Sequence, residues 1–100
     1  MKGSRARRRA TYKYQVGMYT SESKTRMGPR PSGSQLDHIV PRHFGFNNDI
    51  PPVLIGSPDN LQWLPFNANI QKGTRITPDG IELLRKWGFD HLADMREGKL

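Results

Sequence analysis

The absence of cysteine constrains this 100-residue chain more than any other feature of its sequence. Small domains bury a modest share of their surface, and many add disulfides or a metal held by thiolates. A chain without cysteine can form neither disulfides nor thiolate zinc sites. We therefore expect one small domain with a modest core, drawn from the 34% of residues that are hydrophobic.

Membrane insertion is not expected from this sequence. No apolar run approaches the roughly 20 residues that span a bilayer, and no hydrophobic signal stretch follows the basic N-terminus. We therefore expect no membrane partner. The compartment stays undetermined, because proteins of every compartment can lack cysteine.

Positive charge is concentrated at the N-terminal end. Residues 1–30 carry nine Lys or Arg against one acid, whereas residues 31–100 carry seven against eight. A basic arm on a near-neutral body suits a polyanion, because each neutralised phosphate releases condensed counterions. We interpret the arm as a nucleic-acid contact, with a merely solvated leader as the alternative. The residues assigned to this contact are Arg5, Arg7, Arg8 and Arg9.

Residues 1–34 are predicted to form a basic N-terminal arm with a strand and a linker. Apolar residues alternate with polar ones over residues 11–19, which favours a strand, with a helix running in from Arg7 as the alternative. Residues 20–34 are rich in Ser, Thr, Gly and Pro, a composition typical of a loop. This loop would separate the arm from the rest of the chain.

The domain itself is predicted over residues 35–100, with a core at 35–73 and helices at 77–97. Alternating apolar residues indicate short strands, and clusters of turn-forming residues indicate an irregular stretch between them. Together these elements predict an α+β fold. The predicted elements are strands at 35–41 and 60–64, an irregular stretch at 43–59, and helices at 66–73, 77–88 and 90–97.

The C-terminal helices have clear local signals. Thr77 is a good N-cap, Pro78 suits the first helical position, and Gly88 suits a left-handed cap at the end. In the last helix, Leu92 and Met95 are expected to face the core. We interpret both helices as scaffold.

Two segments contain the residues that indicate chemistry. The first reads Asp-His-Ile-Val-Pro from Asp37, and the second reads Asn-Leu-Gln-Trp-Leu from Asn60 and continues to Asn69 and Lys72. Together they resemble the HNH endonuclease family. Its pattern is Asp-His-Ile-x-Pro, a loop, Asn-Leu-x-x-Leu, and a helix bearing His or Asn followed by Lys. The resemblance covers residues 35–73.

The resemblance implies a ββα-metal finger, in which a helix packs across two antiparallel strands joined by a long loop. The predicted strand, loop, strand and helix occur in that order. The resemblance also implies a metal-dependent endonuclease that hydrolyses phosphodiester bonds. Because nothing here resembles a base-reading module, we expect little sequence preference, with DNA as the substrate and RNA as the alternative.

The resemblance also implies a role for each matching residue. His38 would be the general base, since a reference pKa near 6.5 leaves imidazole mostly neutral yet still basic at pH 7. Asp37 and Asn69 would bind the metal, with Asn67 as a rival to Asn69. Asn60 would tie the loop between the strands and so aim His38.

The implied metal is a hard divalent cation. A carboxylate and an amide oxygen favour Mg²⁺ with several retained waters, with Mn²⁺ as the alternative. Many family members hold a structural zinc through Cys-x-x-Cys pairs, and this chain has Pro65 and Ala68 at those positions. No structural zinc is therefore expected. Flanking phosphates are assigned to Arg42, Lys72 and Arg75.

Two other interpretations accompany the nuclease hypothesis. The chain could be a non-catalytic nucleic-acid binder that keeps the finger as a scaffold. Compact HNH domains also resemble phage nucleases and the C-terminal domains of bacterial antagonism toxins. A toxin would be paired with an acidic immunity protein, a partner that the basic arm suits electrostatically.

Overall fold

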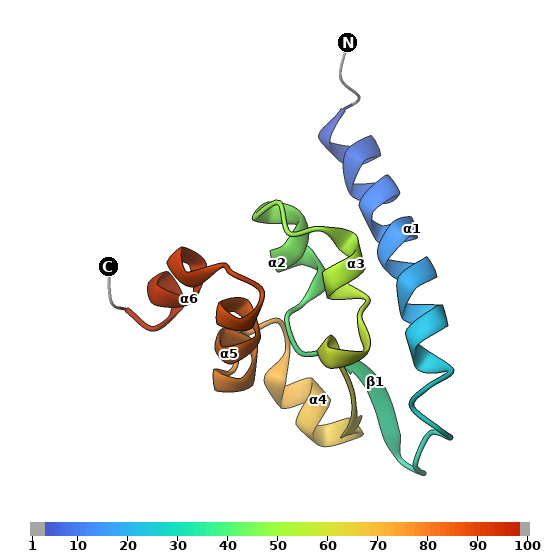
Figure 1. Ribbon diagram of the computed structural model, residues 1–100. Helices are drawn as coiled ribbons and strands as arrows, with labels where there is room; N and C mark the ends of the chain where they lie inside the picture. The colour runs from blue at the N-terminus through green and yellow to red at the C-terminus, as the bar shows by residue number, and fades with distance from the viewer. Residues whose placement is uncertain (1–3, 99–100) are drawn as a thin grey trace.

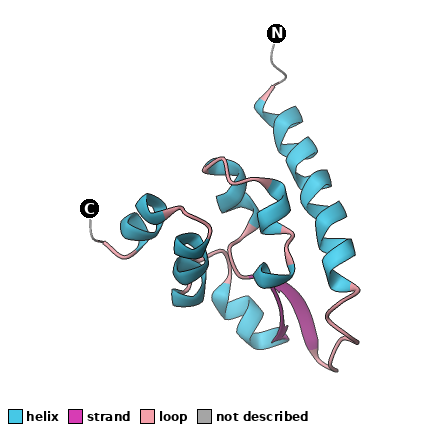
Figure 2. Cartoon of the chain, viewed as in Figure 1, coloured by secondary structure: helices cyan, strands magenta, loops and turns pink. Residues whose placement is uncertain are grey.

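The computed structural model describes residues 4–98, a two-stranded antiparallel sheet with helices before, between and after its strands (Figures 1 and 2). The predicted α+β fold is confirmed. The ends of the predicted arm and domain, residues 1–3 and 99–100, lie outside the described range. The elements are α1 (Arg5–Lys24), β1 (Ser34–His38), α2 (Arg42–Asn47), α3 (Pro52–Ile55), the 3₁₀ helix η1 (Pro58–Asn60), β2 (Leu61–Pro65), α4 (Phe66–Lys72), α5 (Pro78–Lys86) and α6 (Asp90–Arg96).

Helix α1 replaces the strand expected at residues 11–19 and takes up the first part of the predicted linker. Ser4 caps its start, because the hydroxyl accepts a hydrogen bond from the backbone N–H of Arg7 at 3.1 Å. The strand prediction is therefore wrong. Alternating apolar residues include pairs four apart, which also fit a helix that buries one side. The buried residues of α1 are Val16, Thr20 and Ser23.

Helix α1 packs against α3 and α2, so the basic segment belongs to the folded body (Figure 1). The hydroxyl of Ser23 donates to the carbonyl of Gly56 at 2.6 Å. The hydroxyl of Tyr12 donates to the carbonyl of Ile50 at 2.7 Å. The close approach requires glycine at position 56, because a Cβ there would lie 2.9 Å from the carbonyl oxygen of Val16.

Strands β1 and β2 pair with Asp37 opposite Gln62. β1 ends at His38, earlier than the predicted end at residue 41. It ends there because the backbone N–H and carbonyl of Val40 bond to the side chain of Asn60 instead of to a partner strand. Helix α4 follows β2 directly and packs against both strands. The predicted order of strand, connection, strand and helix is confirmed.

The connection between the strands is largely helical, although the sequence predicts an irregular stretch at 43–59. Pro52 occupies the first turn of α3, where a missing N–H costs nothing. Asp49 has a φ of 55° and turns the chain between α2 and α3. The turn-forming residues thus separate short helices and do not prevent them. The core that α1, this connection and the C-terminal helices share comprises Val16, Val40, Phe44, Ile50, Ile55, Leu84 and Ala93.

The C-terminal helices follow their local signals, with one exception. The hydroxyl of Thr77 accepts a backbone N–H of α5 at 3.3 Å, and Gly88 has a φ of 91°, both as predicted. Leu92 packs against the core, but Met95 is 54% exposed, so its predicted inward orientation is wrong. Ala93 is instead the fully buried residue of α6.

Candidate active site

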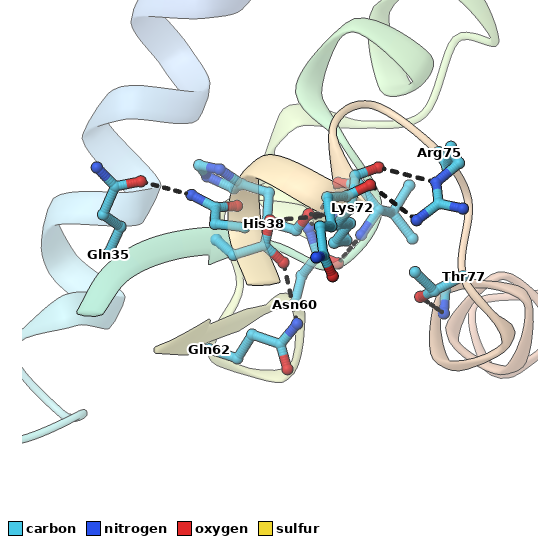
Figure 3. Close-up of polar contacts among 12 residues, drawn as sticks. Gln35, His38, Asn60, Gln62, Lys72, Arg75 and Thr77 are labelled. Atoms are coloured by element: carbon cyan, nitrogen blue, oxygen red, sulfur yellow. Dashed lines mark hydrogen bonds and ion pairs between the residues drawn. The ribbon is translucent and has the colours of Figure 1, made fainter. Parts of the chain in front are cut away.

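Asp37 and His38 are the last two residues of β1, and strand alternation directs their side chains to opposite faces. Asp37 bonds to Lys72 of helix α4, whereas His38 bonds to Thr20 of helix α1. Figure 3 shows the polar contacts on the α4 side of this strand end. Different helices therefore hold the two side chains.

The carboxylate of Asp37 lies in a buried ion pair. Lys72 Nζ is 3.1 Å from Oδ1, and Gln62 Nε2 donates to Oδ2 at 3.0 Å. The same ammonium donates to the backbone carbonyl of His38 at 3.1 Å. Asp37 and Lys72 are only 7% and 6% exposed. Removing either partner would leave an uncompensated buried charge, a costly arrangement.

The imidazole of His38 is fixed by helix α1. Its Nε2 lies 3.0 Å from the hydroxyl oxygen of Thr20, which is itself buried. If Nε2 carries the proton, it donates a hydrogen bond to the Thr20 hydroxyl, and Nδ1 is left as the basic nitrogen. Burial lowers the pKa of His38 below its usual value of 6.5; the charge of Asp37 opposes this shift, and those of Arg42 and Lys72 add to it. The site therefore favours neutral imidazole at pH 7.

Asp37 and His38 nevertheless line one open pocket of about 440 Å³ at the end of β1. Lys72, Arg42 and His43 line the same pocket. Arg42 and His43 are solvent-exposed, whereas Lys72 is buried. The pocket thus combines the Asp37–Lys72 ion pair, two imidazoles and an exposed guanidinium.

Asn69 is not among the residues that line this pocket. Its Nδ2 donates to Oε1 of Gln35 at 2.8 Å, toward the start of β1. The side chain of the rival residue, Asn67, is exposed on α4. The structure therefore brings Asp37 and His38 to one pocket but does not bring either asparagine to it.

Asn60 ties the connection between the strands, as the resemblance implies. Its side chain is fully buried. Oδ1 accepts the N–H of Val40 at 2.7 Å, and Nδ2 donates to the carbonyls of Val40 and Ile55 at 3.0 and 2.8 Å. Because Val40 follows His38 by two residues, these bonds fix the backbone that leaves the pocket. Asn60 makes no contact of its own with the pocket.

The three cations assigned to flanking phosphates differ in their surroundings. Arg42 is exposed at the pocket. Lys72 is buried against Asp37. Arg75 donates to the carbonyls of Gln71 and Lys72 at 2.8 and 3.2 Å, at the end of α4. Of these three cations, Arg42 alone both lines the pocket and is solvent-exposed. The arm residues Arg5, Arg7, Arg8 and Arg9 are exposed along the first turns of α1.

Asp37 offers carboxylate oxygens of the kind that a hard cation binds, but Lys72 already pairs with one of them. The ammonium of Lys72 already bonds to Oδ1 of Asp37 and to the carbonyl of His38, a place that favours positive charge. Among residues 4–98, no three His, Cys, Asp or Glu side chains gather at one point. A divalent ion here would therefore rely on water ligands, as Mg²⁺ commonly does. It would also compete with Lys72 for Asp37.

Two residues that hold the site were not anticipated from the sequence. Thr20 lies in the segment predicted as a loop, and no local pattern connects it with His38. Gln62 does have a signal, because pairing the two predicted strands in antiparallel register places it opposite Asp37. Both supply hydrogen bonds that orient a pocket side chain.

Comparisons with known proteins leave the family unassigned. A scan against protein-family models finds no match, and searches of curated proteins and of solved structures find none. Over the part of the chain that the structure covers, no helix is both long and apolar enough to cross a membrane. The functional assignment therefore depends on the residues and their geometry.

Proposed function

We propose that this chain is a metal-dependent endonuclease of the HNH type that hydrolyses phosphodiester bonds in DNA, with little sequence preference. The observation that carries the proposal is the pocket at the end of β1, where the imidazole of His38 and the carboxylate of Asp37 lie beside an exposed Arg42. Its position on a strand, connection, strand and helix, with Asn60 tying the connection, supports the same assignment.

His38 acts as the general base in this proposal. With Nε2 engaged by Thr20, Nδ1 takes a proton from a water molecule, and the water oxygen attacks phosphorus. The phosphorus bond to the leaving oxygen breaks, and that oxygen takes up a proton from solvent. The lowered pKa keeps His38 unprotonated and ready to accept a proton at neutral pH.

Positive charge at the pocket favours the transition state. Attack on a phosphodiester builds negative charge on the non-bridging and leaving oxygens, and Arg42 lies where it can offset that charge. A divalent cation held by Asp37 would supply Lewis acidity to this step. Asp37 would hold the cation, and Asn69 would be a second ligand only by giving up its bond to Gln35.

Lys72 makes cation binding depend on substrate. Its ammonium neutralises Asp37, so the free protein offers a divalent ion little net negative charge. The phosphate of a bound substrate adds a negative charge to the same pocket. We therefore expect the cation to bind more tightly when substrate is present than to the free protein.

A non-catalytic nucleic-acid binder is the second candidate. The engagement of Asp37 by Lys72 and of Asn69 by Gln35 favours it, because both proposed metal ligands are already satisfied. This candidate predicts salt-dependent DNA binding without cleavage in any metal. Such binding would also survive replacement of Asp37, His38 and Asn69 by alanine.

Metal removal separates the two candidates. Supercoiled plasmid incubated with the protein in Mg²⁺ or Mn²⁺ is expected to become nicked and then linear, because the cation offsets transition-state charge. Agarose gels follow the conversion, and excess EDTA is expected to stop it. Plasmid that stays intact in every divalent metal would refute the nuclease proposal, and cleavage that EDTA leaves unchanged would refute its metal dependence.

The pH dependence of cleavage is set by His38. Because only neutral imidazole accepts a proton, kcat/KM is expected to rise with pH through the pKa of His38 and then level off. Burial lowers that pKa, so the midpoint of the rise is expected below pH 6.5. Initial cleavage rates of a labelled duplex between pH 5 and 8 at fixed Mg²⁺ measure it. A midpoint above pH 6.5 would contradict the assigned environment of His38.

A further inference from the structure

A basic groove lies between the N-terminal half of α1 and helix α2. One depression of about 570 Å³ is lined by residues that include Arg5, Arg8 and Phe46. A second, of about 280 Å³, is lined by residues that include Arg9, Lys13 and Phe46. The two depressions share Tyr12, Phe46 and Asn47 and so adjoin one another.

The groove also adjoins the pocket that holds His38. Arg42 and His43 line both the smaller depression and the His38 pocket. Both residues belong to α2, which follows β1 after a three-residue connection. A ligand lying in the groove could therefore continue into the pocket without leaving the protein surface.

The chemistry of the groove suits a chain of phosphates. Asp49 is the one acid among the lining residues of the two depressions, which otherwise include six cationic side chains of Arg and Lys. The guanidinium carbons of Arg5 and Arg9 lie 5.0 and 5.7 Å from the ring centre of Phe46. These contacts limit the conformations of two long side chains, which lowers the entropic cost of binding an anion.

The length of the groove indicates how much backbone it can hold. From Arg5 to Lys13 a helix rises roughly 12 Å, at about 1.5 Å per residue. One nucleic-acid strand advances about 3.4 Å per nucleotide, so roughly three to four nucleotides span this distance. Arg42 then lies between this stretch and the His38 pocket.

We propose that the groove between α1 and α2 binds the phosphate backbone of the substrate on one side of the bond that is cut, through Arg9, Lys13 and Arg42. This inference rests on the proposed function, because it places the flanking nucleotides relative to His38. The contacts are to the backbone, so binding there is independent of base sequence.

A matched pair of triple variants tests the groove. One carries Arg9→Gln, Lys13→Gln and Arg42→Gln. The control carries Lys24→Gln, Arg26→Gln and Arg30→Gln, which removes the same charge from exposed residues outside the groove. Fluorescence anisotropy in EDTA measures binding to a labelled DNA duplex as salt is varied, with polyglutamate as a second, purely acidic probe.

The groove variant is expected to lower the slope of log affinity against log salt by about 2.7, since each lost phosphate contact removes about 0.9. Raising the salt from 50 to 200 mM lowers the affinity of both proteins. The factor by which it lowers the wild-type affinity is expected to be about 40 times the factor for the groove variant. The control is expected to keep nearly the wild-type slope. Equal slope changes in both variants would overturn the inference, and so would polyglutamate binding as tight as duplex binding.

The cleavage assay keeps failure of the groove separate from failure of the nuclease proposal. If the wild-type protein cuts plasmid but the two triple variants bind with equal salt slopes, the groove assignment is wrong and the nuclease proposal stands. The other case is that only the groove variant shows a smaller slope of log affinity against log salt, and the wild-type protein never cuts plasmid. The groove is then a nucleic-acid site on a non-catalytic binder.

Discussion

The His38→Ala variant is expected to cleave plasmid about 10²- to 10⁴-fold more slowly than the wild-type protein, which is the usual contribution of a general base. The imidazole is held by Thr20 and lines an open pocket, so its removal takes away the proton acceptor without opening the core. Initial rates of plasmid nicking at saturating Mg²⁺ and pH 7.5 give the ratio. DNA binding in EDTA is expected to be retained.

His91 provides the matched control for this experiment. It is exposed on α6 and does not line the His38 pocket. The His91→Ala variant is therefore expected to cut at the wild-type rate. If His38→Ala also cuts at that rate, another group takes the proton and the assignment of the base is wrong.

The Asn60→Ala variant is expected to lower the free energy of unfolding by about 3 kcal/mol or more, because each buried polar group left without a partner costs about 1–3 kcal/mol. The replacement leaves the N–H and the carbonyl of Val40 without a partner, and it removes one hydrogen bond to the carbonyl of Ile55. A small domain has roughly 5–15 kcal/mol of stability in total. Urea denaturation followed by circular dichroism measures the loss.

Asn67→Ala is the control for the stability measurement. Asn67 is exposed on α4, so its replacement by alanine leaves no buried polar group without a hydrogen-bond partner. Its unfolding midpoint is expected to stay close to that of the wild-type protein. A midpoint for Asn60→Ala no lower than that of Asn67→Ala would show that the buried bonds of Asn60 do not hold the connection together.

Local signals predicted much of the fold. The strand pair, helix α4 and helix α5 follow alternation, proline positions and capping residues, all of which act within a few residues of one another. Helix α1 was mispredicted because apolar residues at 11–19 alternate and also recur at a spacing of four. Capping by Ser4 and packing against Gly56 favour the helix over the strand. The packing against Gly56 exists only in the folded structure.

The candidate site was predictable only in part. The motif correctly places Asp37 and His38 on a strand, although that strand ends at His38 and not at residue 41 as predicted. It does not reveal that Lys72 satisfies Asp37 or that Thr20 of a distant helix orients His38. These contacts join residues 35 and 18 positions apart, so only the packing of α4 and α1 against β1 creates them. Asn69 shows the same limit, because its bond to Gln35 depends on where α4 crosses the strand.

The decisive comparison is plasmid cleavage by the wild-type and Asp37→Asn proteins, purified in parallel and assayed together in Mg²⁺. Asparagine keeps the shape of the side chain and one oxygen for Lys72, but it leaves the buried ammonium of Lys72 without its countercharge. Urea denaturation followed by circular dichroism therefore checks that the variant is folded under the assay conditions. We expect the wild-type protein to convert supercoiled plasmid to nicked and linear forms and the variant to leave it supercoiled. Equal conversion by both proteins would contradict a catalytic pocket built on Asp37 and His38.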